Sequence, residues 1–544
     1  MTPEAWDTLV SDYLESTFSA RPDIAVFAGR HEYDGRLPDW SEAGLAEERA
    51  RLARWRTRLE RIDTTKLDSA RRFEREHVLS QIDGDVFWLE RAEWPRRSPA
   101  FYAGGLDPDV YVTRKYAPLE TRLRAYITYA RNVPAATQQI RANLRPPLPR
   151  TYIDRGRGAF GGLASFLAED VPRVFAPVQD TTVQVEFQAA NAGAVAALRE
   201  LDTWLESLRE TQTEDFAIGE VLFRDMLWMT ERVGTPLDEL ARIARADLDR
   251  NLAALRNVCE RHAPGVSVRE CVRRVDAKKP ADSPVAEARR QIAELRAFVE
   301  SKQLVTIPGP EQALVDESPP HMRWNSAYIS IPGPYEKDLP ATYYIAPPDA
   351  SWSEEERAHY VPGKADLLAV SAHEVWPGHF LQFLHSNRAA SRFGKVFVGY
   401  AFAEGWAHYA EELMIEAGLG DGNPEIRIGQ LMNALLRNVR FVTAIGLHTQ
   451  GMSVEEAERI FREEGFQDAG NARQQAARGT FDPGYLNYTL GKLMVLKLRA
   501  DWTATRGGRA AWRAFHDAFL SYGGPPIPLV RAAMLGESAT ASLF

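Results

Sequence analysis

Residues 373–379 carry the side chains of this chain that are best suited to chemistry. They read His-Glu-Val-Trp-Pro-Gly-His, so two imidazoles and a carboxylate fall close together. Two histidines and a later glutamate form a common ligand set for catalytic zinc. A glutamate directly after the first histidine is where a zinc hydrolase keeps its general base. The pattern predicts a metal site with His373 and His379 as ligands and Glu374 as the base.

The spacing of the two histidines departs from the helical zinc motif, in which they stand four residues apart on one face. Here Pro377 occupies the fourth position, and His379 follows at the sixth. On a regular helix six residues turn through about 600°, which would point the two rings apart. Pro377 removes a backbone donor and Gly378 accepts unusual backbone angles, so a kink or bulge can return His379 toward His373. The alternative is that the histidines are structural and the Pro-Gly pair only ends a helix.

Glu404 is the predicted third ligand. It follows His379 at a distance along the chain that allows a turn and a returning helix. Buried glutamate is rare unless it is paired, which favours a ligand over a glutamate buried against Arg or Trp. His408, one helical turn later, is the alternative ligand. Glu411 or Glu412 is placed to orient a ligand histidine from outside, unless both belong to a solvated helix face.

An amide hydrolase also needs a donor for the oxyanion that develops during the reaction. Tyr488 is the first candidate, and Tyr485, about one turn earlier, is the second. The alternative for either tyrosine is a packed core aromatic.

Two arginines precede His448 on a predicted amphipathic helix. Arg437 and Arg440 stand three residues apart, so both can face one cleft. Because Arg is suited to a bidentate grip on a carboxylate, one of them could hold the free carboxyl end of a peptide, which would make the enzyme a carboxypeptidase. The alternative for each arginine is a surface ion pair. His448 is a candidate substrate-binding residue.

Most of the elements that must position these residues read as helices, because good helix formers dominate long stretches. Before the metal motif, helices are expected over 41–62, 67–94, 120–144, 189–210, 236–262 and 284–301. From the motif onward, they are expected over 365–385 with a break at Pro377, then over 396–417, 424–450 and 454–465. Thr235 and Ser283 are the expected caps of the helices that follow them.

Short apolar runs punctuated by Pro and Gly lie just ahead of the metal motif. They cover 304–307, 327–331 and 341–345 and predict a small sheet. An edge strand there could hold an extended peptide by main-chain pairing, although a purely structural hairpin is the alternative. The predicted fold is mostly α, a large helical bundle-like body with a central cleft and a small β-sheet insertion next to the metal helix. We expect a single unit over 1–544, with approximate lobes at 1–302 and 303–544.

At these residues the chain resembles the bacterial family known as domain of unknown function 885 (DUF885). That family carries H-E-x-x-P-G-H-x-x-Q, matched by residues 373–382, and E-G-W-A-x-Y-x-E, matched by residues 404–411. The opening 29–39, Gly-Leu-His at 446–448 and Leu-Gly-Lys at 490–492 also look like family landmarks. The family is grouped with mostly helical zinc metallopeptidases of the gluzincin type. The resemblance implies His373, His379 and Glu404 as zinc ligands and Glu374 as base.

Bulk properties narrow the class of protein. Among 544 residues, 75 are acidic and 66 basic, and the net charge of −9 argues against broad nucleic-acid binding. The two cysteines, Cys259 and Cys271, are expected to be unpaired thiols. No apolar run approaches the roughly 18 residues of a membrane helix, and residues 1–7 lack a signal pattern. These features predict a cytoplasmic protein without a membrane partner.

The sequence therefore predicts a hydrolase with one zinc ion per chain that cleaves amide bonds in short peptides. The restriction to short peptides rests on analogy with helical proteases that have a cleft. One alternative is a metal-dependent hydrolase of a small amide or ester metabolite. The other is a binding protein with a degenerate site, which would have no use for Glu374.

Overall fold

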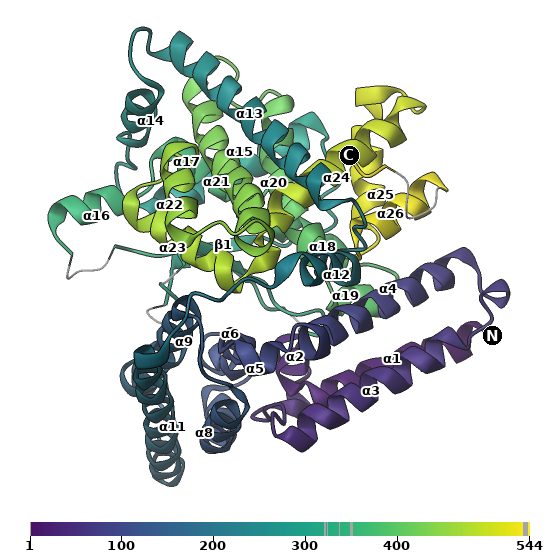
Figure 1. Ribbon diagram of the computed structural model, residues 1–544, viewed down its shortest axis with the longest axis vertical. Helices are drawn as coiled ribbons and strands as arrows, with labels where there is room; N and C mark the ends of the chain where they lie inside the picture. Colours follow the sequence, from purple (N-terminus) through teal and green to yellow (C-terminus); the bar gives the residue numbers. More distant parts are fainter. Residues whose placement is uncertain (1, 320–321, 324, 337, 349–351, 537–541) are drawn as a thin grey trace. The chain divides into compact units, whose positions relative to one another are not determined.

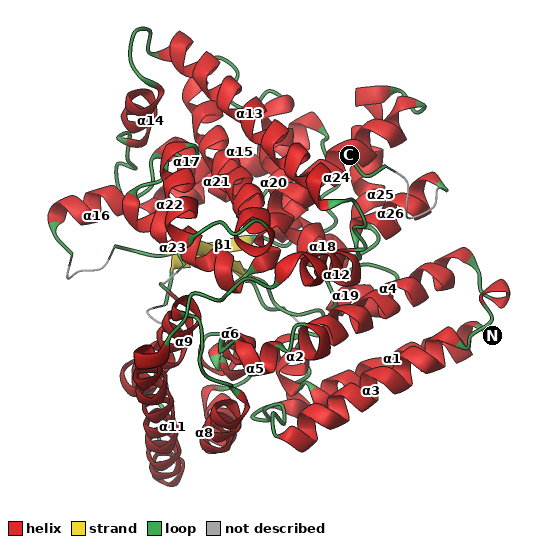
Figure 2. Ribbon diagram, viewed as in Figure 1, coloured by secondary structure: helices red, strands yellow, loops and turns green. Residues whose placement is uncertain are grey.

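The protein is described by a computed structural model that covers residues 2–319, 322–323, 325–336, 338–348, 352–536 and 542–544. Helices dominate it and strands are few, which confirms the predicted class of a mostly α fold with a small sheet (Figure 2). The chain divides into two compact units, Met1–Phe216 with Pro332–Leu339, and Ala217–Ile331 with Pro340–Phe544. The sequence expectation placed its lobe boundary later, between residues 302 and 303.

The first unit is built from antiparallel and crossing helices of very different length (Figure 1). Its longest helices, α8 and α11, pack against each other, and α9 packs on α11. The helices are α1 (Pro3–Ala20), α2 (Pro22–Phe27), α3 (Glu42–Glu60), α4 (Ser69–Val86), α5 (Trp94–Arg97), α6 (Ala100–Ala103), α7 (Asp109–Val112), α8 (Leu119–Asn143), α9 (Arg150–Glu169), α10 (Val171–Phe175) and α11 (Thr181–Ser207).

A histidine ties the 332–339 segment to the rest of the first unit. The Nδ1 atom of His31 lies 3.0 Å from Asp34 Oδ1, its Nε2 lies 3.2 Å from Glu336 Oε1, and its ring stacks on Tyr116. Burial by itself lowers the pKa of His31, but hydrogen bonds to the two carboxylates outweigh it and raise that pKa to about 9. At neutral pH this histidine is a cation held between two anions.

The second unit contains the predicted chemistry. Its helices are α12 (Gly219–Glu231), α13 (Leu237–His262), α14 (Val268–Asp276), α15 (Pro284–Lys302), α16 (Glu354–Tyr360), α17 (Lys364–Glu374), α18 (His379–Ser386), α19 (Arg392–Val396), α20 (Tyr400–Glu416), α21 (Pro424–Thr449), α22 (Val454–Glu463), α23 (Ala469–Phe481), α24 (Asn487–Ala504), α25 (Trp512–Leu520) and α26 (Ile527–Leu535). Helix α21 packs on both α13 and α17, and α20 packs on α24. Ser283 caps α15 as predicted, whereas Pro236, and not Thr235, occupies the cap position of α13.

The small sheet lies in the second unit and has the strand order β1-β3-β2. Strand β1 (Ala313–Glu317) runs parallel to β3 (Ala341–Ile345), and β2 (Ala327–Ser330) pairs with β3 in the antiparallel direction. The runs at 327–331 and 341–345 are therefore strands, but the prediction of a strand at 304–307 was wrong. Backbone groups of that run bond to side chains instead: His516 donates to Leu304 O, and the Thr306 amide donates to Asp517.

Two glycines let the backbones of α20 and α24 come into direct contact. A Cβ on Gly405 would overlap the backbone of Gly491, and a Cβ on Gly491 would overlap the carbonyl oxygen of Ala401. Only glycine fits at both positions, because any side chain would push the two helices apart. This contact fixes the residue that precedes Gly405 in the sequence, Glu404.

The cysteine prediction was wrong. Cys259, near the end of α13, and Cys271, in α14, form a disulfide.

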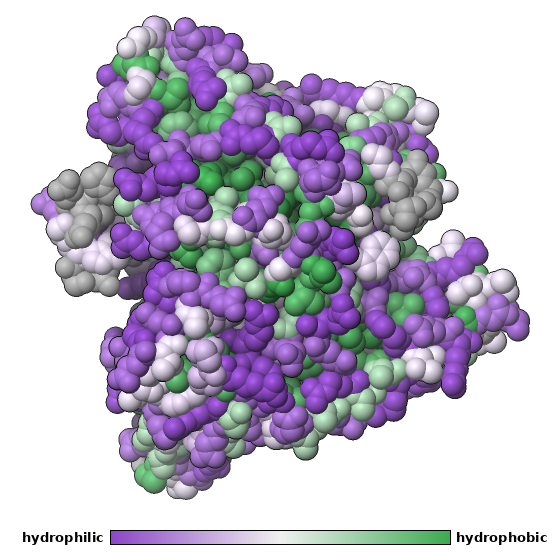
Figure 3. All heavy atoms as spheres, in the orientation of Figure 1, coloured by the Kyte–Doolittle hydropathy of each residue, from purple (hydrophilic) through white to green (hydrophobic). Residues whose placement is uncertain are grey.

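Hydrophilic residues cover most of the face drawn in Figure 3, with apolar residues in scattered patches. Among the described residues, no helix is both long and apolar enough to cross a bilayer.

Candidate metal centre

The two histidines are brought together by a helix that ends and restarts, rather than by one bent helix. Helix α17 ends at Glu374, and α18 begins at His379. Between them the chain turns through a cis Trp376–Pro377 peptide bond, and the Gly378 amide donates to the carbonyl of Ala372. A Cβ on Gly378 would overlap the carbonyl oxygen of His373, so the turn requires glycine.

Helix α20 delivers the third predicted ligand and holds the turn. Glu404 lies in its first turns, and Trp406, two residues later, donates its indole N–H to the carbonyl of Pro377 at 2.8 Å. Trp406 is fully buried, which anchors this hydrogen bond against the core. The turn between the histidines and the helix that carries the glutamate are thus fixed to one another.

The three predicted ligands converge. The Nε2 atoms of His373 and His379 lie 3.2 and 3.3 Å from the same oxygen, Glu404 Oε2. Donor atoms of the three residues lie within 4.8 Å of one another. Zinc binds nitrogen and oxygen at about 2.0–2.1 Å, so the edge of a zinc tetrahedron measures about 3.3 Å. The two measured separations match that edge.

A carboxylate fixes the proton on one of the two predicted ligand histidines. Glu411 Oε1 lies 2.7 Å from the Nδ1 atom of His373. Burial by itself would raise the pKa of Glu411, but Arg437 and His408 hold it well below its usual range, so this carboxylate is charged. Arg437 Nη2 lies farther from this Nδ1, at 3.2 Å, and at the same distance from Glu411 Oε1, which can accept its hydrogen. A charged carboxylate only accepts, so Nδ1 of His373 carries the hydrogen and Nε2 presents its lone pair to the centre.

This tautomer places two acceptors face to face. The bare Nε2 of His373 and the Glu404 carboxylate lie 3.2 Å apart, and a contact of this kind is favourable only with a proton or a cation between them. The Nδ1 atom of His379 has no hydrogen-bond partner among the described residues. The donor set, two nitrogens and one carboxylate oxygen, suits zinc.

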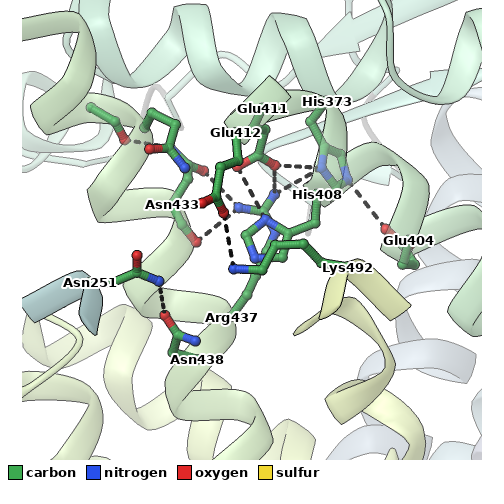
Figure 4. A network of polar contacts seen from close by, with 12 residues as sticks. Asn251, His373, Glu404, His408, Glu411, Glu412, Asn433, Arg437, Asn438 and Lys492 are labelled. Atoms are coloured by element: carbon green, nitrogen blue, oxygen red, sulfur yellow. Dashed lines mark hydrogen bonds and ion pairs between the residues drawn. The ribbon is translucent and has the colours of Figure 1, made fainter. Parts of the chain in front are cut away.

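Behind His373, buried charges alternate in sign (Figure 4). The Nη2 atom of Arg437 lies 3.2 Å from Glu411 Oε1. The next carboxylate, Glu412, pairs with Arg250 at 2.8 Å and with Lys492 at 3.4 Å. Burial would raise the pKa of Glu412, yet Lys492 and Arg250 lower it to about 2. Each buried charge has a counter-charge, which makes the arrangement tolerable and rigid.

His408, the alternative ligand, is fully buried beside the same carboxylate. Its Nδ1 lies 3.4 Å from Glu411 Oε2, and its Nε2 has no partner among the described residues. Burial and the nearby Lys492 lower its pKa to about 4, so it is neutral at physiological pH. It contacts Glu411, the carboxylate that orients His373, and does not belong to the converging set.

The predicted base, Glu374, lies at the end of α17 and is 9% exposed. Burial raises its pKa to about 7, with the Glu404 charge acting in the same direction. His379, Arg437 and a hydrogen bond from the Ile329 backbone oppose that rise. The Ile329 contact places edge strand β2 next to this carboxylate.

The two candidate tyrosines have different surroundings. The ring of Tyr488 stacks on His373, with ring centroids 6.3 Å apart. Burial raises the pKa of Tyr488, and the Glu404 charge adds to that rise, so its hydroxyl keeps its proton. Tyr485 is fully buried and its hydroxyl pairs with Thr443 at 2.6 Å. Of the two, Tyr488 is the one in contact with a predicted ligand.

The candidate substrate-binding residues, like the tyrosines, differ in their surroundings. Arg437 pairs with Glu411 and bonds the carbonyl of Asn433, so it braces the buried network instead of reaching for a substrate. His448 is 1% exposed, accepts from the Ile218 amide and donates to the carbonyl of Gly479, so both ring nitrogens are engaged with backbone. Neither arginine is a surface ion pair. Arg440 is 7% exposed and donates from Nε to Gln475 at 2.9 Å.

Residues near the centre that sequence reasoning missed include Tyr400 and Arg478. Tyr400 contacts the ring of Tyr488 edge-on, and Arg478 donates to the hydroxyl of Tyr400 at 3.0 Å. Tyr400 stands four residues before Glu404 on α20, a spacing that could have marked it. Arg478 is on another helix, and no local pattern points to it.

The family described as "Bacterial protein of unknown function (DUF885)" matches residues 22–534. No curated protein matches the chain. Two solved structures share its fold. One, described as a candidate lipoprotein of unknown function from Shewanella oneidensis, has a TM-score of 0.78 at 24% identity, over 97% of this chain and 99% of that one. The other, a candidate lipoprotein from Colwellia psychrerythraea, has a TM-score of 0.83 at 19% identity, over 97% and 98%.

These two structures overturn the expectation of a cytoplasmic location. Both are described as candidate lipoproteins. A lipoprotein is held at a membrane by its lipid, which points away from free residence in the cytoplasm.

Proposed function

This chain belongs to the DUF885 family of bacterial proteins of unknown function, and we propose that it is a zinc-dependent hydrolase of amide bonds in short peptides. The observation that carries the proposal is the convergence of His373, His379 and Glu404, with Glu411 fixing the proton on His373. A histidine locked in this tautomer by a carboxylate is a recurring feature of zinc sites. Kinship with gluzincin-type metallopeptidases is part of the proposal, because those enzymes also combine two histidines with a glutamate from a later helix.

Two nitrogens and one carboxylate oxygen would hold a single zinc ion and leave a fourth position for water or substrate. When bound, zinc lowers the pKa of a water molecule and polarises a carbonyl group. Three protein ligands with an open position is the pattern of a catalytic site and not of a structural one.

Glu374 is the general base of the proposal. It follows a ligand histidine, and burial holds its pKa near 7 in the unliganded protein. A carboxylate in that range can take a proton from water and pass it to the leaving nitrogen. Its burial also keeps bulk water from competing for that proton.

Tyr488 is the proposed donor to the developing oxyanion. Its ring lies against His373 and its hydroxyl is protonated. Arg478, which hydrogen-bonds to Tyr488, would hold the ring in place and increase its strength as a donor.

Strand β2 supplies a surface for an extended peptide. It is an edge strand of the sheet, and its Ile329 amide is directed to Glu374 instead of to β3. In this proposal, backbone groups on this side of β2 pair with a substrate main chain next to the base. Main-chain pairing favours unfolded peptides and gives little selectivity for their side chains.

We also infer that the protein acts outside the cytoplasm. The two structural relatives are described as candidate lipoproteins, and the Cys259–Cys271 disulfide suits an oxidising compartment. Cell fractionation with thiol labelling tests this inference: an oxidised pair in the periplasmic or membrane fraction is expected, and reduced protein in the cytosolic fraction contradicts it.

The functional test is a Glu374→Gln variant compared with wild type on a mixed pool of short peptides analysed by mass spectrometry. Wild type should contain one zinc per chain and lose activity when a chelator removes it. Glu374→Gln should keep the zinc and lose turnover by about 100- to 10,000-fold, the usual contribution of a general base. Full activity in this variant, or active wild type without metal, would refute the proposal.

A further inference from the structure

Three guanidinium groups surround one tyrosine ring beside the candidate metal centre. The Cζ atoms of Arg437, Arg440 and Arg478 lie 5.7, 4.7 and 5.9 Å from the ring centroid of Tyr488. They come from α21 and α23, and Tyr488 comes from α24. Three cations within such a small volume repel one another unless anions accompany them.

Two of these cations have their own anions. Arg437 lies 3.2 Å from Glu411, and Arg478 lies 2.9 Å from Asp482. Both arginines are therefore neutralised inside the protein.

The third cation has none. Arg440 is 7% exposed, and its one hydrogen-bond partner among the described residues is a neutral amide, which accepts from Nε at 2.9 Å. Burial lowers the pKa of Arg440, and Arg478 and Arg437 lower it further. Burying a cation without a counter-ion costs free energy of folding, and the protein keeps Arg440 buried despite that cost.

The unpaired part of Arg440 is its outer edge. Gln475 holds Nε, which orients the guanidinium plane, while the two terminal nitrogens have no partner among the described residues. The described polar atoms that are buried from solvent and unpaired include Nε of Arg437 but neither terminal nitrogen of Arg440. The terminal nitrogens of Arg440 are therefore accessible to a ligand. Two parallel N–H donors that a ligand can reach match the two oxygens of a carboxylate.

The distance to the metal ligands limits the size of the ligand. Arg440 Cζ lies 4.7 Å from the Tyr488 ring centroid, which lies 6.3 Å from that of His373, so the guanidinium is within about 11 Å of the His373 ring. Extended peptide spans about 3.3–3.6 Å per residue. One or two residues fit between a bond cleaved at the metal and a carboxylate held by Arg440.

We propose that Arg440 binds the free terminal carboxylate of a peptide substrate, so that the enzyme releases one or two residues from the carboxyl end. This inference rests on the proposed peptidase function and specifies its substrate class. Gln475 is a positioning residue in this scheme, because it acts through Arg440.

The experiment measures binding without turnover. Zinc-loaded Glu374→Gln protein is titrated calorimetrically with acetyl-Ala-Ala-Ala as the free acid and as the carboxamide. The free acid should bind at least about 30-fold more tightly, as expected for a buried charged hydrogen-bonded pair. Adding Arg440→Gln should reduce this preference to less than about threefold, while Arg459→Gln, an exposed arginine on α22 paired with Glu463, should leave it unchanged.

If Arg440→Gln fails to fold, Arg440→Lys is the second variant, because it keeps the positive charge. Lysine offers a point charge instead of a planar fork, so the preference for the free acid should fall by several-fold without loss of zinc. Inorganic phosphate is the competitor: if it binds more tightly than the free acid, the assignment to a peptide carboxylate is overturned.

The outcomes separate this inference from the proposed function. If wild type hydrolyses acid and amide equally well, the peptidase stands and the carboxylate site fails. If neither peptide is hydrolysed but the acid preference depends on Arg440, the carboxylate site stands and the peptidase fails. Equal binding of the two peptides, or a preference that survives Arg440→Gln, overturns the inference in either case.

Discussion

Replacing Glu411 by glutamine should weaken zinc binding although Glu411 touches no metal. The glutamate accepts the Nδ1 hydrogen of His373 at 2.7 Å and neutralises Arg437. Glutamine has nearly the same shape and can still accept this hydrogen bond. The substitution therefore removes the charge and leaves the geometry.

The magnitude follows from the strength of that bond. A charge-assisted hydrogen bond is about twice as strong as a neutral one, which makes the loss about 1–2 kcal/mol. Because 1.4 kcal/mol is about tenfold in affinity, zinc should bind about 10- to 30-fold more weakly. This lies within the range of about 10- to 100-fold that is usual for the partners of metal ligands.

Glu412→Gln is the matched control. It removes the neighbouring buried carboxylate, whose partners are Arg250 and Lys492 and not a ligand histidine. Glu411→Gln removes the carboxylate that pairs with the buried Arg437 and should lose about 3–5 kcal/mol of stability. Glu412→Gln should lose less, because Lys492 and Arg250 keep Asp247 as a counter-ion at 2.9 and 2.8 Å. Only the Glu411 variant should lose zinc affinity.

The assay is a competition titration of zinc against a chromogenic chelator, with the folded fraction followed by circular dichroism. Folded Glu411→Gln protein that binds zinc within twofold of wild type would refute the argument from tautomer and charge. Equal weakening in both variants would show that zinc loss follows from general loosening of the fold.

Three further predictions concern the fold. Gly378→Ala should destabilise the protein by about 3 kcal/mol and abolish stoichiometric zinc binding, because the new methyl group meets the carbonyl of His373; a variant with full zinc content and wild-type melting contradicts this. Replacing Cys259 and Cys271 together by alanine should cost about 3 kcal/mol in urea unfolding, as expected for a bridge with a sequence separation of 12; an unchanged midpoint contradicts it. His31, with a pKa raised from 6.5 to about 9, should stabilise its unit fully below pH 6.5 and lose that effect as pH rises through 9. The melting-temperature gap between wild type and His31→Gln should therefore shrink between pH 6 and pH 10, and a gap that widens contradicts the sign.

The sequence pointed to the side chains of the candidate centre where local chemistry was sufficient. The types and order of His373, Glu374, His379 and Glu404 indicated a ligand set, and the structure brings the three predicted ligands together. The route differs from the expected one, because the Pro-Gly pair ends one helix and a new helix starts at His379. Sequence periodicity does not distinguish a kink from a complete break.

Residues whose role depends on distant neighbours could not be assigned in this way. Arg437 and Arg440 looked equivalent in the sequence, yet α20 places Glu411 beside the first, and none of the described carboxylates forms an ion pair with the second. His448 looked available, but two backbone segments occupy its nitrogens. The run at 304–307 looked like a strand until side chains from α25 took its backbone hydrogen bonds.

The order of residues alone thus determined which groups are candidate metal ligands, because ligand chemistry depends on side-chain type and on close spacing. It also determined the mostly helical class, because propensity and apolar spacing act within a few turns. Only the tertiary structure decided which charges are neutralised and which cation remains unpaired. Pairing of buried charges depends on helices that are remote in sequence, and a short-range pattern carries no information about them.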